Sequence, residues 1–595
     1  MKIKILLLLA IVSINAYSNR PSKNEKAPNV ILILTDDQGI GELACHGNPW
    51  IKTPNIDKFY KDAVRMTDFH VSPVCTPTRG AIMTGRYPIN NGAWATYKGR
   101  DALSEDAPTM ANVFKQNGYK TAIFGKWHLG DNYPVRPDDC GFEHVVRHLA
   151  GGVGELSDYW GNNYFDDVYL VNNKPTQFKG YCTDIWFQEA MNYISDAKDE
   201  AKPFFIYLPT NAPHGPLYVD EKYAKPYKHL VGDKIVSAEF YGMITNIDEN
   251  FGKLEAFLKK NKIADNTILI YMTDNGSSYG VSKDGKVGYN MGLRGSKGYR
   301  TEGGHRVPFF IRWKDGKVKG GRDIAEATAH VDLIPTLASL CQLNIPESMK
   351  LDGLDFSPLL LKKTEKLPKR NIYVHSRQDW RPPMDVNQTC IVNNKWRLVN
   401  GNEYYNIETD RMQLNNLASQ HPTQVQELLQ DNDDFLKVSK ANPEYNELPL
   451  NIIGNPKQNP INLTIQHAIG EGRGIWKSEQ VAAGMKNVNN THALKVDRAG
   501  QYTISCRRWP IECPGKIWGV PAQNPKDWFT YKTIQPQKVR IKIANQILEK
   551  DIKEEDVEVT FNVFLEKGKT LLVNDFIEGK KQYGVYYTYI TYNGE

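Results

Sequence analysis

The sequence predicts an α/β protein with a doubly wound, mostly parallel sheet, followed by a small antiparallel subdomain and a β-sandwich. Several short apolar runs each end in a polar cluster with glycine or proline, as in APNVILILTDDQG. A stretch with helical periodicity separates two of these runs, and alternating strand-like segments replace this pattern after about residue 371. At 595 residues the chain also exceeds what one hydrophobic core usually supports, so several folded units are expected.

The apolar runs are typical of strands in a parallel sheet. Val30 to Leu34 is uninterrupted, which favours burial on both faces. The same design recurs in GYKTAIFGKWHLG, KPFFIYLPTNAPHG and NTILIYMTDNGS. Between the last two, SAEFYGMITNIDENFGKLEAFLKKN carries apolar residues at helical spacing. Because ligands bind at the carboxyl ends of strands in such sheets, the four polar clusters are expected to converge on one edge.

Changes in hydrophobic pattern and composition along the chain predict the domain boundaries. The main α/β domain is assigned to residues 27–370, and a small antiparallel sheet plus a helix that completes it to residues 371–440. An Asn- and Pro-rich stretch, residues 441–460, is interpreted as a linker. Residues 461–595 alternate with period two between turn residues, which predicts a β-sandwich accessory domain.

The N-terminus and the composition bear on location and partners. Residues 1–18, with two lysines, an apolar run and small residues before Asn19, are typical of a signal peptide, so export to a periplasm or the medium is expected. No later apolar run is long enough for a transmembrane segment. The formal charge of +6 is spread along the chain, which disfavours a nucleic-acid partner but suits an anionic substrate.

Two acidic clusters predict a cation site. Asp36 and Asp37 end one predicted strand, and Asp274 and Asn275 end another. Each cluster alone would be interpreted as an ordinary turn. Together, at the same edge of one sheet, they offer the oxygen ligands that calcium or magnesium prefers.

Cys75 stands out by its surroundings. Pro73 and Pro77 stiffen the backbone around it, and TPTRGAIMTG reads as the start of a helix whose dipole would favour negative charge at position 75. Arg79, four residues on, shares the same helical face and can hold an anion. A lone cysteine is more often a buried apolar residue, but this setting favours a chemical role.

These residues resemble a known family. Cys75-Thr76-Pro77-Thr78-Arg79 is similar to the C-x-P-x-R signature of the sulfatases, a family of the alkaline-phosphatase superfamily. The resemblance continues, in order, through TDDQG, TGRYPINNG, GYKTAIFGKWHLG, APH, TDNG, LRGSKGYRTEGGHRVP and HVDLIPTL. It covers about Asn29 to Leu417 and implies an alkaline-phosphatase-like fold and sulfate ester hydrolysis.

The resemblance also implies a modified nucleophile and a metal. Cys75 would be oxidised by a formylglycine-generating maturation enzyme to 3-oxoalanine (formylglycine), which hydrates to a diol. One hydroxyl would attack sulfur, and deprotonation of the other would release sulfate. The implied calcium ligands are Asp36, Asp37, Asp274, Asn275 and the modified side chain at Cys75.

The remaining catalytic residues follow from the same motifs. Lys126 and Lys297 would stabilise charge on the sulfate oxygens, and Arg79 would fix the diol. His214 is assigned as the acid that protonates the leaving alcohol, and His128 as the base that collapses the sulfated adduct. The division of roles between the two histidines stays open.

The expected partner is a sulfated poly- or oligosaccharide, because the signal peptide and β-sandwich resemble exported bacterial polysaccharide sulfatases. Ulvan, carrageenan and fucan lead, with arylsulfatase or glycosaminoglycan sulfatase activity as alternatives. The candidate substrate-binding residues are Tyr97, Arg100, Arg136, His148, Trp380 and Arg381.

Two rival functions stay open. A phosphodiesterase or phosphonate hydrolase of the same superfamily is disfavoured by Asn275. A carbohydrate-binding protein with an inactive catalytic domain is disfavoured by the complete set of catalytic positions. For the β-sandwich, a structural lid is weighed against an independent sugar-binding module, which would need exposed aromatic residues such as Trp509, Trp518 or Trp528.

Overall fold

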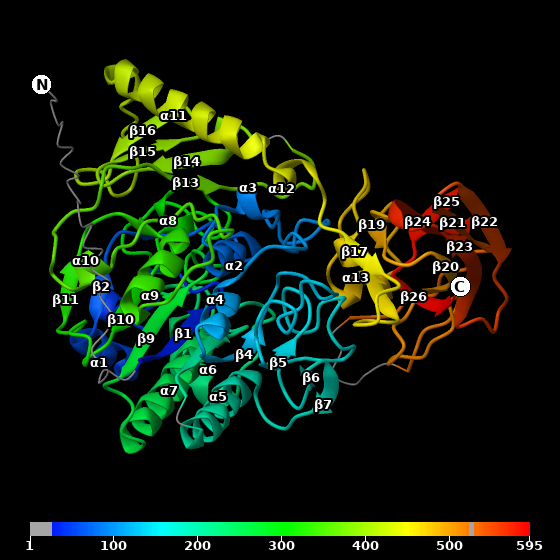
Figure 1. The fold of residues 1–595 in the computed structure, drawn as a ribbon, viewed down its shortest axis with the longest axis horizontal. Helices are drawn as coiled ribbons and strands as arrows, with labels where there is room; N and C mark the ends of the chain where they lie inside the picture. Colours follow the sequence, from blue (N-terminus) through cyan, green and yellow to red (C-terminus); the bar gives the residue numbers. More distant parts are fainter. Residues whose placement is uncertain (1–26, 201, 383, 523–528, 595) are drawn as a thin grey trace, which may run out of the picture.

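The computed structural model describes residues 27–200, 202–382, 384–522 and 529–594 (Figure 1). The predicted signal peptide, residues 1–18, and Trp528 lie outside these described residues. Within them, no helix combines the length and the apolar character that a membrane crossing would need.

The main domain is built on a ten-stranded mixed sheet. Its strand order is β11-β2-β10-β9-β1-β8-β4-β5-β6-β7, and β9, β1, β8, β4 and β5 run parallel to one another. The predicted α/β fold with a mostly parallel sheet is therefore confirmed. The strands are β1 (Asn29–Thr35), β2 (Val64–Met66), β4 (Lys120–Lys126), β5 (His144–His148), β6 (Val168–Val171), β7 (Lys174–Gln177), β8 (Phe204–Pro209), β9 (Thr267–Thr273), β10 (Phe309–Arg312) and β11 (Arg322–Ile324).

Helices cover both faces of this sheet because alternate side chains of each central strand point to opposite sides. In β1, Val30, Leu32 and Leu34 join one buried cluster with residues of α2, α4 and α9, whereas Ile31 and Ile33 join another with residues of α1, α5 and α7. These helices are α1 (Pro54–Asp62), α2 (Cys75–Thr84), α4 (Met110–Gln116), α5 (Cys182–Asp199), α7 (Ala238–Lys260) and α9 (Leu333–Cys341). The helix expected from periodicity is confirmed as α7, where Ser237 caps the first turn by accepting a hydrogen bond from Phe240 N.

Short elements complete the main domain. They are β3 (Phe69–His70), which pairs with β12 (Thr328–Ala329), and the helices α3 (Pro88–Asn91), α6 (Glu221–Ala224), α8 (Glu302–His305) and α10 (Ser357–Leu360). The predicted subdomain follows as an antiparallel sheet covered by one long helix, seen at the top of Figure 1. It consists of β13 (Ile372–His375), β14 (Thr389–Val392), β15 (Trp396–Val399), β16 (Glu403–Asn406) and α11 (Pro422–Lys440).

The accessory domain contains two further sheets that enclose their own buried cluster, at the right of Figure 1. One is formed by β17 (Asn451–Ile453), β19 (Thr491–Val496), β24 (Gly568–Glu578), β21 (Lys538–Ile543), β22 (Gln546–Asp551) and β25 (Lys581–Gly584). The other is formed by β18 (Ile461–Thr464), β26 (Tyr587–Gly594), β20 (Gly500–Arg507) and β23 (Glu558–Leu565), and α13 (Ser478–Ala482) precedes β19.

The linker assignment differs from the structure. Residues 441–460 contain α12 (Pro443–Asn446) and β17, and β17 pairs in parallel with β19 of the accessory domain. The sandwich therefore begins before residue 461. A three-residue strand gives too short a pattern to be recognised among asparagines and prolines.

Candidate active site

Four neighbouring strands place the predicted catalytic residues at one edge of the main sheet. β1 leads into Asp36 and Asp37, and the adjacent β9 leads into Asp274 and Asn275. Thr35 and Thr273 are register partners, so the residues that follow them begin side by side. On the other side of β1, β8 leads toward His214 and β4 ends at Lys126. The expected convergence of the four polar clusters is therefore seen.

Helix α2 brings Cys75 to this edge. Cys75 is its first residue, and the whole helix is buried. Two hydrogen bonds fix the segment before the helix: Gly298 N donates to Pro73 O, and Thr78 Oγ1 of the helix itself donates to Ser72 O. Cys75 is thereby held in the protein interior, at a helix N-terminus where backbone N–H groups favour an anion.

The acidic residues and Cys75 form a compact donor set. Ligand atoms of Asp36, Cys75 and Asp274 all lie within 4.8 Å of one another. Asp36 Oδ1 and Asn275 Oδ1 are buried and have no hydrogen-bond partner. A buried oxygen without a partner is costly in a native fold unless something else binds it. These oxygens fit the calcium site that the sequence predicts.

Three cationic side chains surround this donor set. Arg79 donates from Nε and Nη2 to Asp274 Oδ2, at 3.1 and 2.7 Å, and from Nη1 to Lys126 O at 3.0 Å. Lys126 Nζ lies 2.6 Å from Asp36 Oδ2, and Lys297 Nζ lies 2.7 Å from Asp37 Oδ1. Each predicted cation therefore contacts at least one predicted metal ligand.

The two histidines are oriented by main-chain carbonyls. His128 Nε2 lies 3.0 Å from Thr96 O and donates its hydrogen to this carbonyl. In the neutral imidazole Nδ1 then carries a lone pair, which points toward Cys75 Sγ at 3.4 Å. His214 Nδ1 donates to Gly215 O at 2.7 Å, so Nε2 faces the site, 3.7 Å from Asp37 Oδ2. Asp37 and His128 also have positive φ angles of 68° and 55°, a backbone strain that collects at functional sites.

Burial and neighbouring charges shift the protonation of this site. Burial lowers the pKa of His214 to about 3, and the positive charge of Lys297 adds to this effect. Burial also lowers the pKa of His128 well below its usual value, and there the charge of Lys126 contributes. Both imidazoles are therefore neutral before an anion binds. Burial, then the Asp36 carboxylate, raise the pKa of Asp274 to about 6, and burial also raises the pKa of the Cys75 thiol. Unmodified Cys75 is accordingly not a thiolate nucleophile.

A cavity of about 280 Å³ opens beside these groups. Asp37, His214 and Lys297 line it from the main domain, together with Glu155 and Tyr279. Trp476, Lys477 and Glu479 line it from the accessory domain. Its size lies near the lower end of small-molecule sites, about 300–1,000 Å³.

None of the six predicted substrate-binding residues lines this cavity among the residues that the structure describes. Arg100 is buried and donates to the carbonyls of Trp380, Glu444 and Glu447. Arg136 pairs with Asp139. The guanidinium groups of both arginines are hydrogen-bonded to protein groups, so the structure gives these two residues a structural role.

The other four candidates also contact protein groups. His148 is buried, and its Nδ1 donates to Leu149 O. Trp380 Nε1 donates to Gly470 O, and Arg381 pairs with Asp379 and Glu471. The Tyr97 ring packs on Trp476 at 5.2 Å between centroids. Trp380, Arg381 and Tyr97 thus contact the accessory domain, and only Tyr97 touches a residue that lines the cavity.

Sequence reasoning missed Glu155, Trp476 and Lys477. Trp476 and Lys477 lie far from every recognised motif, in GEGRGIWKSEQ. An aromatic residue beside a lysine in a glycine-rich loop was a signal, but nothing in the sequence indicated that this loop reaches the catalytic domain.

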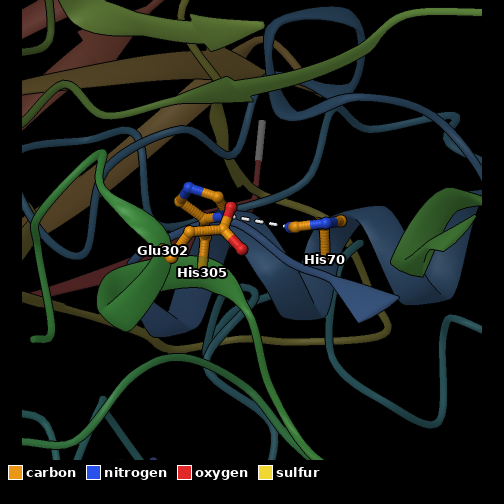
Figure 2. Close-up of side chains that lie close together, drawn as sticks. All are labelled: His70, Glu302 and His305. Carbon is orange, nitrogen blue, oxygen red and sulfur yellow. Dashed lines mark hydrogen bonds between the residues drawn. The ribbon is translucent and has the colours of Figure 1, made fainter. Parts of the chain in front are cut away.

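A second cluster of potential metal ligands lies outside this site. Figure 2 shows His70 of β3 with Glu302 and His305 of α8, and the two histidines contact each other through Nδ1 at 3.0 Å. Glu302 accepts from Arg397 Nε at 2.6 Å and from Arg306 Nη1 at 3.0 Å. Because two guanidinium groups already satisfy this carboxylate, the cluster is a buried ion-pair network and not a second metal site.

Comparison with known proteins identifies the family. The sulfatase family model matches residues 28–343, more than half of the chain. A second model, described as the C-terminal part of N-sulphoglucosamine sulphohydrolase, matches residues 296–441. The chain therefore belongs to the sulfatase family, for which formylglycine dependence is the family property. The resemblance expected from the motifs is confirmed.

Two curated relatives illustrate the distance within the family. Arylsulfatase J of Mus musculus is 32% identical over 342 residues, which cover 55% of this chain and 55% of that protein. N-acetylgalactosamine-6-sulfatase of Homo sapiens is 28% identical over 359 residues, which cover 56% of this chain and 66% of that protein. The chain thus spans between about half and two thirds of the length of these relatives.

Solved structures give the same fold. The crystal structure of Ps i-CgsB in complex with k-i-k-neocarrahexaose is 28% identical with a TM-score of 0.63, and covers 71% of this chain and 95% of that one. PsFucS1 sulfatase from Pseudoalteromonas sp. has a TM-score of 0.58 at 21% identity, and covers 70% of this chain and 91% of that one. Because its identity is only 21%, the similarity to PsFucS1 sulfatase supports the fold and nothing further.

Proposed function

We propose that this protein hydrolyses sulfate esters of a sulfated oligo- or polysaccharide, using a formylglycine made from Cys75. The observation that carries the proposal is the buried cluster at the carboxyl ends of β1 and β9. There, Asp36, Cys75 and Asp274 place ligand atoms within 4.8 Å of one another, and two oxygens lack partners. Sulfate chemistry requires a nucleophile, a cation and a source of protons at one point, and this cluster supplies positions for each.

Calcium is the proposed cation because every ligand besides position 75 is a carboxylate or amide oxygen. Asp36, Asp37, Asp274 and Asn275 would hold it, with the oxygens of modified Cys75. When bound, it would lower the proton affinity of the formylglycine diol and neutralise charge on the sulfate.

The side chains of this chain divide the remaining work. His128 Nδ1 faces Cys75 Sγ at 3.4 Å, and this sulfur stands where an oxygen of the modified residue would lie. His128 is therefore placed to remove a proton from a hydroxyl at position 75. Lys126 and Lys297 would bind sulfate oxygens. Arg79 donates to Asp274 and would keep this carboxylate in place.

His214 would give a proton to the leaving alcohol. Its Nε2 faces the cavity because Nδ1 is held by Gly215 O. Its pKa, lowered to about 3 by burial and then by Lys297, leaves it neutral in the free site. A bound sulfate brings negative charge, which favours protonation of His214 beside the leaving group.

The proposed substrate is a sulfated galactan of the carrageenan type. Ps i-CgsB, which shares 28% identity with this chain, was crystallised with a neocarrahexaose. Ulvan and fucan follow as other algal polysaccharides, and glycosaminoglycans are the alternative. Export by the predicted signal peptide would bring the enzyme to such polymers outside the cytoplasm.

Free sulfate release tests the proposal. Protein whose Cys75 peptide has the mass of formylglycine is incubated with carrageenan, ulvan, fucan and glycosaminoglycan oligosaccharides, beside Cys75→Ala. Sulfate release from one polymer class, absent in the variant, is expected. No release from any of them by formylglycine-containing protein would contradict the proposal, and a phosphodiester substrate run in parallel covers the rival hydrolase function.

A further inference from the structure

The cavity beside the catalytic residues has walls from two domains. The two family models end at residues 343 and 441, so the accessory domain lies outside both of them. Nevertheless its residues Trp476, Lys477 and Glu479 line the same cavity as Asp37 and His214. The β-sandwich therefore contributes surface to the candidate active site.

Hydrogen bonds to main-chain carbonyl groups hold residues 476–478 of the accessory domain against the catalytic domain. Leu156 N donates to Trp476 O at 3.0 Å, and Ser478 Oγ donates to Gly154 O at 2.9 Å. Glu155 and Lys477 form an antiparallel bridge between these two contacts. Gln480 Oε1 accepts from the backbone N–H groups of Trp476 and Lys477 at 2.8 and 2.9 Å. The wall is therefore preorganised, which lowers the cost of binding a ligand.

The contact between the two domains also extends to His128, the proposed base. Glu155 Oε2 accepts from Gln466 Nε2 of the accessory domain at 2.8 Å and from Gly151 N at 3.1 Å. Gly151 packs against the imidazole so closely that an added Cβ would lie 2.4 Å from His128 Cε1. The accessory domain thus supports the loop that covers His128.

The side chains of Trp476 and Lys477 suit a sugar. Trp476 is half-buried, with its ring held against Tyr97. An indole face beside a cavity binds the apolar face of a sugar ring. The Lys477 side chain is 51% exposed and lies 3.6 Å from Glu479, a single ion pair that leaves ammonium donors for hydroxyl or sulfate groups.

The tryptophans that an independent sugar-binding module would need are placed differently. Trp509 is fully buried, and Trp518 is half-buried with Nε1 donating to Pro536 O. Both pack with the core of the accessory domain. Among the described residues of this domain, two aromatic side chains line the cavity, Trp476 and Phe529, and Trp476 is the one that lies in the segment bridged to Glu155.

We propose that Trp476 and Lys477 of the accessory domain bind the saccharide part of the substrate, and so select oligosaccharides over small sulfate esters. This rests on the proposed sulfatase function. The β-sandwich is then neither a separate binding module nor only a lid, but one wall of the substrate site.

The first test compares two substrates. For Trp476→Ala, the ratio of kcat/KM for a carrageenan hexasaccharide to that for nitrophenyl sulfate is expected to fall about tenfold, the effect of losing one aromatic contact. Trp476→Phe should restore most of this ratio, and Lys477→Ala should lower it about threefold. The matched control Trp518→Ala removes a half-buried tryptophan of the same domain outside the cavity and should leave the ratio unchanged.

The second test does not depend on turnover. Calorimetry measures the Kd of the same hexasaccharide for Cys75→Ala and for the double variant with Trp476→Ala, and Kd should rise about tenfold in the double variant. Equal Kd values, no binding in either protein, or an unchanged selectivity ratio would overturn the subsite. Absence of sulfate release by the unaltered enzyme, with Kd still dependent on Trp476, would instead contradict the proposed function and leave the subsite standing.

Discussion

Two buried clusters in the main domain contain potential metal ligands, and they differ in how their polar atoms are paired. At the cluster of Asp36, Cys75 and Asp274, Asp36 Oδ1 and the neighbouring Asn275 Oδ1 accept no hydrogen bond. In the cluster at His70, Glu302 and His305, which Figure 2 shows, both oxygens of Glu302 accept hydrogen bonds from arginines that lie outside the drawn set. Burial and crowding are common to both, so the unsatisfied oxygens are what distinguishes a candidate ion site from a structural network.

The pKa of Asp274 in the first cluster is also shifted in the opposite direction from the pKa values of the carboxyl groups in the second. In the second cluster the carboxylates of Asp68 and Glu302 face the guanidinium groups of Arg306 and Arg397. These partners lower the pKa values of both carboxyl groups against the opposing effect of burial. In the first cluster, burial and the nearby Asp36 carboxylate instead raise the pKa of Asp274, and the opposing Arg79 guanidinium does not outweigh these two effects.

The largest expected difference between the clusters is in catalysis. Cys75→Ala should lower sulfate release at least about 10⁴-fold, because it removes the nucleophile, while the thermal midpoint changes by only a few degrees. Kinetics and thermal unfolding measure the two effects. Cys506→Ala, a buried cysteine of the accessory domain, is the control and should keep full activity. Substantial activity in Cys75→Ala would show that the first cluster is not the reaction centre.

The second cluster should show its effect in stability. Glu302→Gln keeps the shape of the side chain but leaves Arg397 and Arg306 to share the single carboxylate of Asp68 in the interior, so the free energy of unfolding should fall by about 3–5 kcal/mol. Chemical denaturation measures the loss. Addition of zinc should not raise the stability of the unaltered protein at this cluster. A Glu302→Gln variant that is as stable as the unaltered protein would show that the ion pairs are not needed.

Metal removal should sharpen the contrast. Chelation of calcium should lower the thermal midpoint, and restoring calcium to about 100 times its Kd should regain about 2.7 kcal/mol. Asn275→Ala, which removes an unsatisfied oxygen, should need more calcium for the same recovery. Differential scanning calorimetry measures both proteins. If calcium leaves the midpoint of the unaltered protein unchanged, the unpaired oxygens do not mark a calcium site.

A third ionic group, at the domain boundary, provides the smallest of these effects. His467 of the accessory domain contacts Asp101 and Asp131 of the main domain. Burial would lower the pKa of His467, but Asp101 outweighs it and raises this pKa from 6.5 to about 10. Because the folded-state pKa is the higher one, this stabilisation is complete below pH 6.5 and is lost as pH rises toward 10.

The variant His467→Gln measures this contribution. At pH 6 the unaltered protein should be more stable than the variant by about 2 kcal/mol, and the difference should shrink steadily up to pH 10. Denaturation curves across this range give the difference directly. A gap that is constant with pH would show that His467 acts by packing and not by its charge.

The sequence by itself determined most of the candidate catalytic centre. Asp36, Asp37, Asp274 and Asn275 directly follow buried strands, and Cys75 begins a helix, so local pattern and motif order placed them at one edge of the sheet. Chain connectivity is enough for this because parallel strands of one sheet end together. The two large domains and the antiparallel subdomain followed from periodicity in the same way.

Only the tertiary structure decided which residues form the walls of the candidate substrate cavity. Arg100 and His148 were plausible by residue type, yet the fold buries both. Trp476 and Lys477 were not predicted, although they line the cavity from more than 300 residues beyond Glu155, to which Lys477 is bridged. Contacts between domains depend on how two finished surfaces dock, and no local periodicity or spacing in the chain encodes that choice.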